Sequence, residues 1–229
     1  MPDPFLPGNP PIPLILRRSA QARRISLRIS QLDGRVTLTM PKSLKEAEGL
    51  AFAREKESWI RRHLEARGAD VAIGIGAQFP LGGKMVRIEP GQGRRIQLGK
   101  ETVLVPGRED RVPARLAAHL KELARDRLLG ACDDYAAILG KPYTKLTLRD
   151  TRSRWGSCTA DGGLMFSWRL ILTPPEVLDY VAAHEVAHLA QMNHSAAFWA
   201  EVERIYGPYK EARAWLRTHG SDLHRYRFA

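Results

Sequence analysis

The feature that most constrains this chain is the His-Glu-Val-Ala-His run of residues 184–188, which is followed by His194. On a helix, residues four apart lie on the same face, so His184 and His188 can share one metal ion. Glu185 would then reach a water molecule at the open side of that ion, and His194 would supply a third ligand. This is the zinc-protease signature. The competing interpretation is two surface histidines on a polar helix face, and the additional histidine favours the metal site.

This spacing predicts a specific chemistry. Catalytic zinc sites hold the ion with three protein ligands and keep a fourth position for water. We therefore expect His184, His188 and His194 to bind Zn²⁺. Glu185 is the predicted catalytic residue, because it can act as general base for a zinc-bound water that attacks a peptide carbonyl. The expected enzyme is a zinc metallopeptidase with a protein or peptide substrate.

Several nearby residues have open roles. The oxyanion of such a reaction needs a stabilising group besides the metal, and Arg154, Tyr206 and Tyr209 are the candidates. Cys158 is a further candidate metal ligand. The strand around Cys158 could bind an extended peptide by backbone pairing, or it could belong to a purely structural hairpin.

The helix that carries the motif is predicted to start with Thr173 as its N-cap and Pro174 in the first turn, and Glu176 would complete a capping box. The usual turn after such a helix has a glycine where this chain has Gln191. Asn193 is therefore expected to make the turn in the left-handed conformation. Ser195 is expected to cap the next helix.

Composition limits the class of protein. The 229 residues carry a net charge of +11, which suggests an acidic partner such as DNA or RNA, although a basic surface that serves solubility is the alternative. The sequence contains only two cysteines, which implies no disulfide framework and fits the cytoplasm. No apolar run approaches the length of a membrane span. Residues 1–13 are expected to be an extended or disordered leader.

The region of residues 14–110 is predicted to be rich in β-structure with one helix. Residues 24–29 and 36–40 alternate as a hairpin with Asp33-Gly34 at its turn. Ser43 is expected to cap a helix that runs to about Arg67. The predicted buried positions of that helix are Leu50, Trp59, Ile60 and Leu64. A basic patch is possible on the hairpin, formed by Arg17, Arg18, Arg23, Arg24 and Arg28.

Residues 111–229 are predicted to form the catalytic domain. Apolar residues recur at helical spacing from 112 to 139, and Gly140 suits the helix end. Residues 145–149, 154–158 and 164–170 are predicted to form three short antiparallel strands. The expected fold class is α+β: an N-terminal β-rich region followed by a minimal zincin-like domain with an antiparallel sheet and an H-E-x-x-H helix.

Motifs along the chain also carry a family resemblance. They are Arg154-Trp155-Gly156-Ser157-Cys158, Trp168-Arg169-Leu170, Asp179-Tyr180-Val181, the motif of residues 184–188, and Asn193-His194-Ser195 with Phe198-Trp199. Together they resemble the YgjP-like zinc metallopeptidases, which are related in their metal motif to the SprT and Wss1 proteases. The resemblance implies a minimal zinc-peptidase core with three histidine ligands. Ser167 and Ala187 depart from the family pattern, and neither is a ligand.

A second class of function stays open. The chain could be a basic module, associated with nucleic acid or with protein linked to DNA, in which zinc is mainly structural. Glu185 discriminates between the two, because a purely structural site does not need it.

Overall fold

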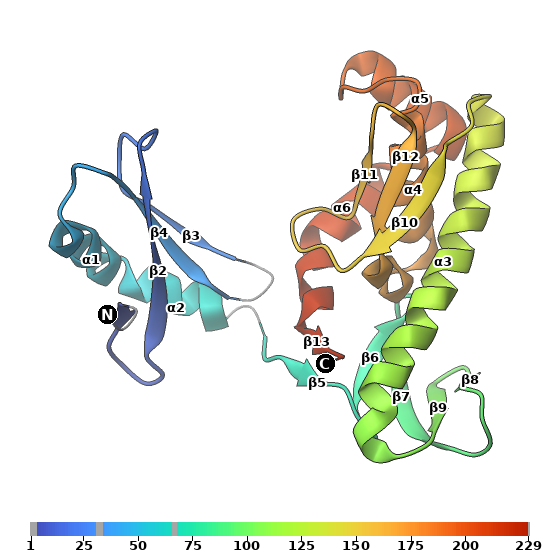
Figure 1. Ribbon diagram of the computed structural model, residues 1–229, viewed down its shortest axis with the longest axis horizontal. Helices are drawn as coiled ribbons and strands as arrows, with labels where there is room; N and C mark the ends of the chain where they lie inside the picture. Colours follow the sequence, from blue (N-terminus) through green and yellow to red (C-terminus); the bar gives the residue numbers. More distant parts are fainter. Residues whose placement is uncertain (1–3, 31–33, 66–67, 229) are drawn as a thin grey trace. The chain divides into compact units, whose positions relative to one another are not determined.

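The computed structural model describes residues 4–30, 34–65 and 68–228, and it divides the chain into two compact units, Met1–Ala69 and Asp70–Ala229 (Figure 1). The boundaries expected after residues 13 and 110 differ from this division. Residues 71–106 belong with the later unit because their buried side chains, such as Phe79, Ile88 and Val103, join the same core as the helix that follows them.

The first unit contains a four-stranded sheet in the order β1-β2-β4-β3. Its strands are β1 (Phe5–Leu6), β2 (Ile12–Ser19), β3 (Ser26–Ile29) and β4 (Val36–Pro41). The predicted hairpin is confirmed, since β3 and β4 pair antiparallel, whereas β2 runs parallel to β4. The expected turn residue Asp33 lies outside the described residues. The described part of the expected leader belongs to this sheet: β1 pairs antiparallel with the start of β2, so the chain reverses between them, and Leu6 and Ile12 are buried in the core of the unit.

Two helices, α1 (Glu46–Glu55) and α2 (Glu57–Glu65), complete the first unit. The predicted single helix is thus interrupted at Lys56, and its expected end at Arg67 is outside the described residues. The Ser43 cap was wrong, because the N-cap is Lys45 and no side chain caps the helix. Ile60 is fully buried, but Trp59 is 36% exposed and is not the core residue that the spacing predicts.

The second unit begins with a sheet in the order β6-β7-β9-β8. Its strands are β6 (Gln78–Leu81), β7 (Lys84–Gly91), β8 (Gln97–Leu98) and β9 (Thr102–Pro106), and a separate pair joins β5 (Val71–Ala72) to β13 (Tyr226–Arg227). The short η1 turn (Glu109–Arg111) leads into α3 (Val112–Leu139). The predicted helix is confirmed: α3 is continuous through Gly130, and it ends at Gly140 with φ of 74°.

A three-stranded sheet follows α3 and lies along it in Figure 1. It comprises β10 (Lys145–Arg149), β11 (Gly156–Cys158) and β12 (Gly163–Ser167), in the order β10-β12-β11. The prediction of an all-antiparallel sheet was wrong, because β10 pairs parallel to β12. The tight β11–β12 hairpin reverses the chain once, and β12 then inserts between its two predecessors.

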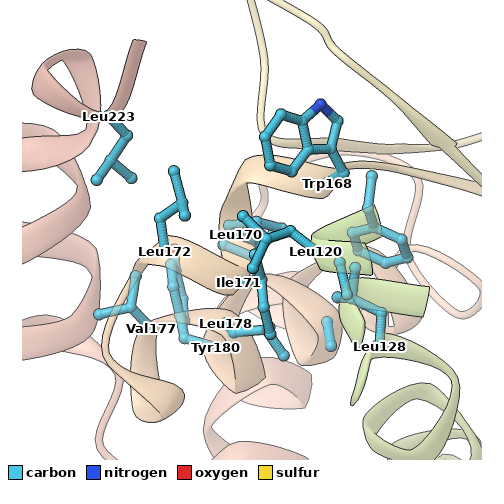
Figure 2. Packing of buried hydrophobic residues seen from close by; sticks show 14 of the residues in the cluster. Leu120, Leu128, Trp168, Leu170, Ile171, Leu172, Val177, Leu178, Tyr180 and Leu223 are labelled. Atoms are coloured by element: carbon cyan, nitrogen blue, oxygen red, sulfur yellow. The ribbon is translucent and has the colours of Figure 1, made fainter. Parts of the chain in front are cut away.

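The chain continues from β12 into the short helix η2 (Trp168–Leu172) rather than extending the strand to Leu170. Figure 2 shows Leu170 and Ile171 of η2 among Leu120 and Leu128 of α3 and Leu178 of α4 (Pro175–Ala187). This packing fixes α4, which carries the H-E-x-x-H motif, against the longest helix of the unit.

Arg169 attaches the C-terminal segment to this core. Its guanidinium is buried and pairs with Asp150, with Nε 2.7 Å from Oδ1. It also donates to the carbonyl oxygens of Leu223 and Tyr226, both at 3.0 Å. Because a buried charge must be paired and hydrogen-bonded to be tolerated, Arg169 is a structural residue of the motif Trp168-Arg169-Leu170.

The turn between β6 and β7 holds the beginning of α4. Backbone N–H groups of Gly82 and Gly83 donate to the carbonyls of Ile171 and Leu172 at 3.0 and 3.1 Å. Gly83 has φ of 75°, and a Cβ there would lie 2.7 Å from Cγ of Pro174, so only glycine fits.

The remaining helices are α5 (Ala196–Tyr206), α6 (Lys210–His219) and η3 (Gly220–Arg225). The α4 cap is displaced by one residue from the prediction, because Pro174 is the N-cap and the Thr173 hydroxyl donates to Leu170 instead. The α+β class is confirmed. Within the described part of the chain, no helix combines the length and apolarity that a membrane span requires.

Candidate metal centre

The three histidines of the motif converge in the structure. His184 lies on the last turn of α4, His188 is the C-cap of that helix, and His194 lies in the loop before α5. One ring nitrogen from each lies within 4.8 Å of the others. The Nε2 atoms of His184 and His194 are 3.1 Å apart. Nitrogens that share a tetrahedral zinc ion lie about 3.3 Å apart, so the spacing of this pair fits such an ion.

The loop after α4 orients His188. Its Nδ1 lies 2.9 Å from the carbonyl oxygen of Gln191, so Nδ1–H donates to that carbonyl and Nε2 keeps its lone pair for a metal. The left-handed turn expected at Asn193 was wrong, since no described non-glycine residue has positive φ. Instead, the N–H groups of Leu189 and Ala190 donate to carbonyls three residues earlier, at 2.9 and 3.0 Å, so α4 ends in a tight turn.

Phe198 supports all three imidazoles. Ser195 caps α5 as predicted, because its hydroxyl oxygen accepts from the Phe198 N–H at 3.4 Å. The ring of Phe198 stacks on that of His188 with 4.4 Å between centroids, and it lies 4.9 and 4.8 Å from the rings of His184 and His194. The family motif includes Phe198, but the motif alone does not indicate that Phe198 contacts the three histidines.

Burial keeps two of the three histidines, His184 and His188, neutral. Burial, followed by the neighbouring histidines and Arg213, lowers the pKa of His184 to about 3. Burial also lowers the pKa of His188, although the Gln191 carbonyl opposes this. Neutral imidazole is the form that binds a metal, so the fold presents these ligands without a competing proton at pH 7.

Glu185 points to the other side of the site, against β11. Its side chain is only 6% exposed, and a Cβ on Gly156 would lie 2.6 Å from its Oε1. Burial raises the pKa of Glu185 to about 8, although the positive charge of Arg154 opposes this rise. A cation held by the three histidines would also lower this pKa, because an adjacent positive charge stabilises the carboxylate. The role of Gly156 in admitting this carboxylate was missed from the sequence.

The structure gives different surroundings to the three candidates for stabilising the oxyanion and to Cys158, the candidate fourth ligand. Tyr206 donates its hydroxyl to the carbonyl of Glu176 at 2.8 Å, and Tyr209 stacks on Trp199 with 5.0 Å between ring centroids. Arg154 is exposed, and its charge acts on Glu185. Cys158 is not part of the three-histidine group, and its thiol donates to the carbonyl of Thr159.

Comparison with known proteins gives a family. The model described as "YgjP-like, metallopeptidase domain" matches residues 23–219, which include every residue of the candidate site. Among solved structures, the crystal structure of the metallopeptidase zymogen of Pyrococcus abyssi abylysin matches with a TM-score of 0.36 and 21% identity, over 41% of this chain and 92% of that one. No curated protein matches significantly. The extent of the family match confirms the resemblance that the motifs indicated, and the chain therefore belongs to the YgjP-like metallopeptidase family.

Proposed function

We propose that this protein is a zinc-dependent peptidase in which His184, His188 and His194 hold the ion and Glu185 is the general base. The observation that supports this most is the convergence of three imidazoles, with one ring nitrogen from each within 4.8 Å of the others, beside the buried carboxyl group of Glu185 on α4. A purely structural zinc site has four protein ligands, and the described residues group only three here.

A zinc ion at this site would acidify a water molecule and polarise the carbonyl of the bond to be cut. Glu185 accepts the proton of the attacking water and then passes it to the leaving amine. Gly156 leaves space for the carboxylate, and Arg154 supports its ionised form. The same charge makes Arg154 a better candidate than Tyr206 for stabilising the oxyanion, because the Tyr206 hydroxyl is already bonded to Glu176.

The proposed substrate is an extended peptide. β11 is an edge strand that pairs only with β12 among the described strands, and its first residue, Gly156, touches Glu185. Backbone pairing along this edge would bring a peptide to the catalytic side of the site.

The proposal can be tested by digesting a proteome-derived peptide library with purified protein. We expect cleavage by the zinc-loaded enzyme, loss of cleavage after chelation, and recovery when zinc is restored. His194→Ala should lower zinc affinity and cleavage together, whereas His63→Ala, an exposed histidine of the first unit, should change neither. Cleavage that persists in fully metal-free protein would refute the proposal.

A second candidate function, binding of DNA or RNA, rests on the first unit. Arg17 pairs across from Thr39, and Arg28 from Thr37, so both arginines lie on the same face of the sheet. That face is exposed, as the 44% exposure of Ile15 indicates. Arg18 points to the opposite face and donates to the carbonyls of Lys42 and Leu44. Two exposed arginines on an open sheet favour contact with phosphates.

A further inference from the structure

A depression of about 480 Å³ lies between α6 and the side chains of Trp155 and Tyr180. Trp155 and Tyr180 form its aromatic wall, and Lys210, Arg213 and Arg217 line it from α6. These three cations share one helix face, because they are separated by three and four residues. We call this feature the basic depression.

Two residues that line the basic depression lie next to residues of the candidate site. The ring of Tyr180 lies 5.9 Å from that of His184. Trp155 directly precedes Gly156, the residue against which Glu185 lies. The Arg213 guanidinium lies 4.5 Å from the ring centroid of Trp199, whose ring is 5.6 Å from that of His184. A peptide placed for cleavage would therefore extend over this surface.

No described carboxylate neutralises the charge of these three side chains. Lys210, Arg213 and Arg217 are all exposed, and none forms an ion pair with a carboxylate among the residues that the structure describes. Arg213 is held in place by its stacking on Trp199. A preorganised guanidinium beside aromatic walls is a strong receptor for a carboxylate, because the hydrogen bonds are charge-assisted and partly shielded from water.

We propose that the basic depression is a substrate subsite that binds a carboxylate of the peptide close to the cut bond. The carboxylate can be an Asp or Glu side chain or the C-terminus of the peptide. This inference rests on the proposed peptidase function and adds a substrate class to it: peptides with an acidic group at a fixed distance from the cleavage site.

The first test measures binding without cleavage. Immobilised, zinc-loaded Glu185→Gln protein is incubated with the peptide library, and the retained peptides are sequenced. We expect enrichment of acidic peptides, and we expect the added substitutions Lys210→Glu and Arg217→Glu to reduce it about tenfold or more. The matched control is Arg94→Glu with Arg95→Glu, two exposed arginines of the β7–β8 connection, which makes the same change in net charge. If both double variants lose the enrichment of acidic peptides equally, the net charge of the protein explains the binding and the inference is overturned.

The second test uses cleavage by the enzyme with Glu185 intact. The cleaved peptides should share an acidic residue or a free C-terminus at one position relative to the cut, and Lys210→Glu with Arg217→Glu should raise KM for them more than it lowers kcat. Substituting Glu by Gln in the best peptide, or amidating its C-terminus, identifies which carboxylate is bound. Cleavage with no acidic preference would overturn the subsite but leave the peptidase proposal standing.

Two outcomes separate the proposals further. If no peptide is cleaved but the binding test still shows selective, position-dependent loss in the α6 variant, the peptidase proposal fails and the carboxylate site stands. If a single-stranded oligonucleotide displaces every retained peptide and binds the α6 variant far more weakly than the control variant, the face binds nucleic acid and the peptide subsite is wrong.

Discussion

The absence of a side chain at Gly156 leaves the space in which the Glu185 carboxylate lies. The carboxylate of Glu185 occupies the space where a Cβ at position 156 would lie, so Glu185 can lie this close to β11 only because residue 156 is glycine. Glu185 is buried in this position, and burial raises its pKa. The local geometry thus makes the ionisation of Glu185 depend on a nearby cation.

Gly156→Ala should therefore impair catalysis without removing the metal. The new methyl group displaces the carboxylate, and misplacing a catalytic group by about 1 Å typically costs on the order of 10²-fold in rate. Zinc content should be unchanged, because no ligand is touched. Gly130→Ala is the control, since a Cβ there meets nothing within 4 Å. Wild-type cleavage rates in Gly156→Ala would contradict this role.

His224 predicts a pH dependence of stability. Burial, followed by the charge of Arg169, lowers the pKa of His224 from 6.5 to about 4. The folded state therefore favours the neutral imidazole. Its contribution to the free energy of unfolding is complete above pH 6.5 and is lost as the pH falls toward 4, by at most about 3 kcal/mol.

Chemical denaturation of wild type and His224→Gln across this pH range measures the effect. The free energy of unfolding of the wild type should fall more steeply as the pH drops, and the metal-site histidines cancel in the comparison because both proteins contain them. Parallel curves would mean that His224 does not titrate as described.

At the scale of single elements, the open face of the first sheet carries the second candidate function. If Arg17 and Arg28 contact phosphates, binding of DNA or RNA should weaken steeply as salt rises, with a log–log slope set by the number of phosphates neutralised. Arg17→Glu with Arg28→Glu should flatten that slope. Arg54→Glu with Arg62→Glu makes the same charge change on the helices of this unit. No binding at low salt would leave the charge as a solubility feature.

The elements differ in how well the sequence predicts them. α3 and the β3–β4 hairpin follow from apolar periodicity and glycine placement, and both are confirmed. The parallel pairing of β10 with β12 could not be predicted, because strand direction depends on contacts that are distant in sequence. The cap of α4 shifted by one residue for a different, local reason: the Thr173 hydroxyl donates to the Leu170 carbonyl three residues earlier instead of capping the helix.

The candidate site shows the same division. The grouping of His184 and His188 could be predicted because a helix fixes their spacing. Its supports were not predictable: Gly156 comes from a strand about 30 residues earlier, and the stacking of Phe198 on His188 depends on how α5 returns over α4. Spacing identifies groups within one element, whereas packing between elements determines what surrounds them.

At the scale of the whole molecule, the second unit contains every residue of the candidate site and its own core. Residues 70–229 expressed alone should therefore unfold cooperatively and bind about one zinc ion per chain. Thermal denaturation followed by circular dichroism, together with elemental analysis, checks both. A fragment that lacks a cooperative transition, while the full chain shows one, would contradict the independence of this unit.

The central claim for the whole molecule is that it cuts peptides with Glu185 as base. Glu185→Gln keeps nearly the same shape but cannot accept a proton at neutral pH. Zinc content and thermal stability should change little, because Glu185 is not a proposed ligand. Cleavage of a substrate found with the wild-type enzyme should fall about 10²–10⁴-fold. If the fully zinc-loaded variant cuts that substrate as fast as the wild type, Glu185 is not the base and the account is wrong.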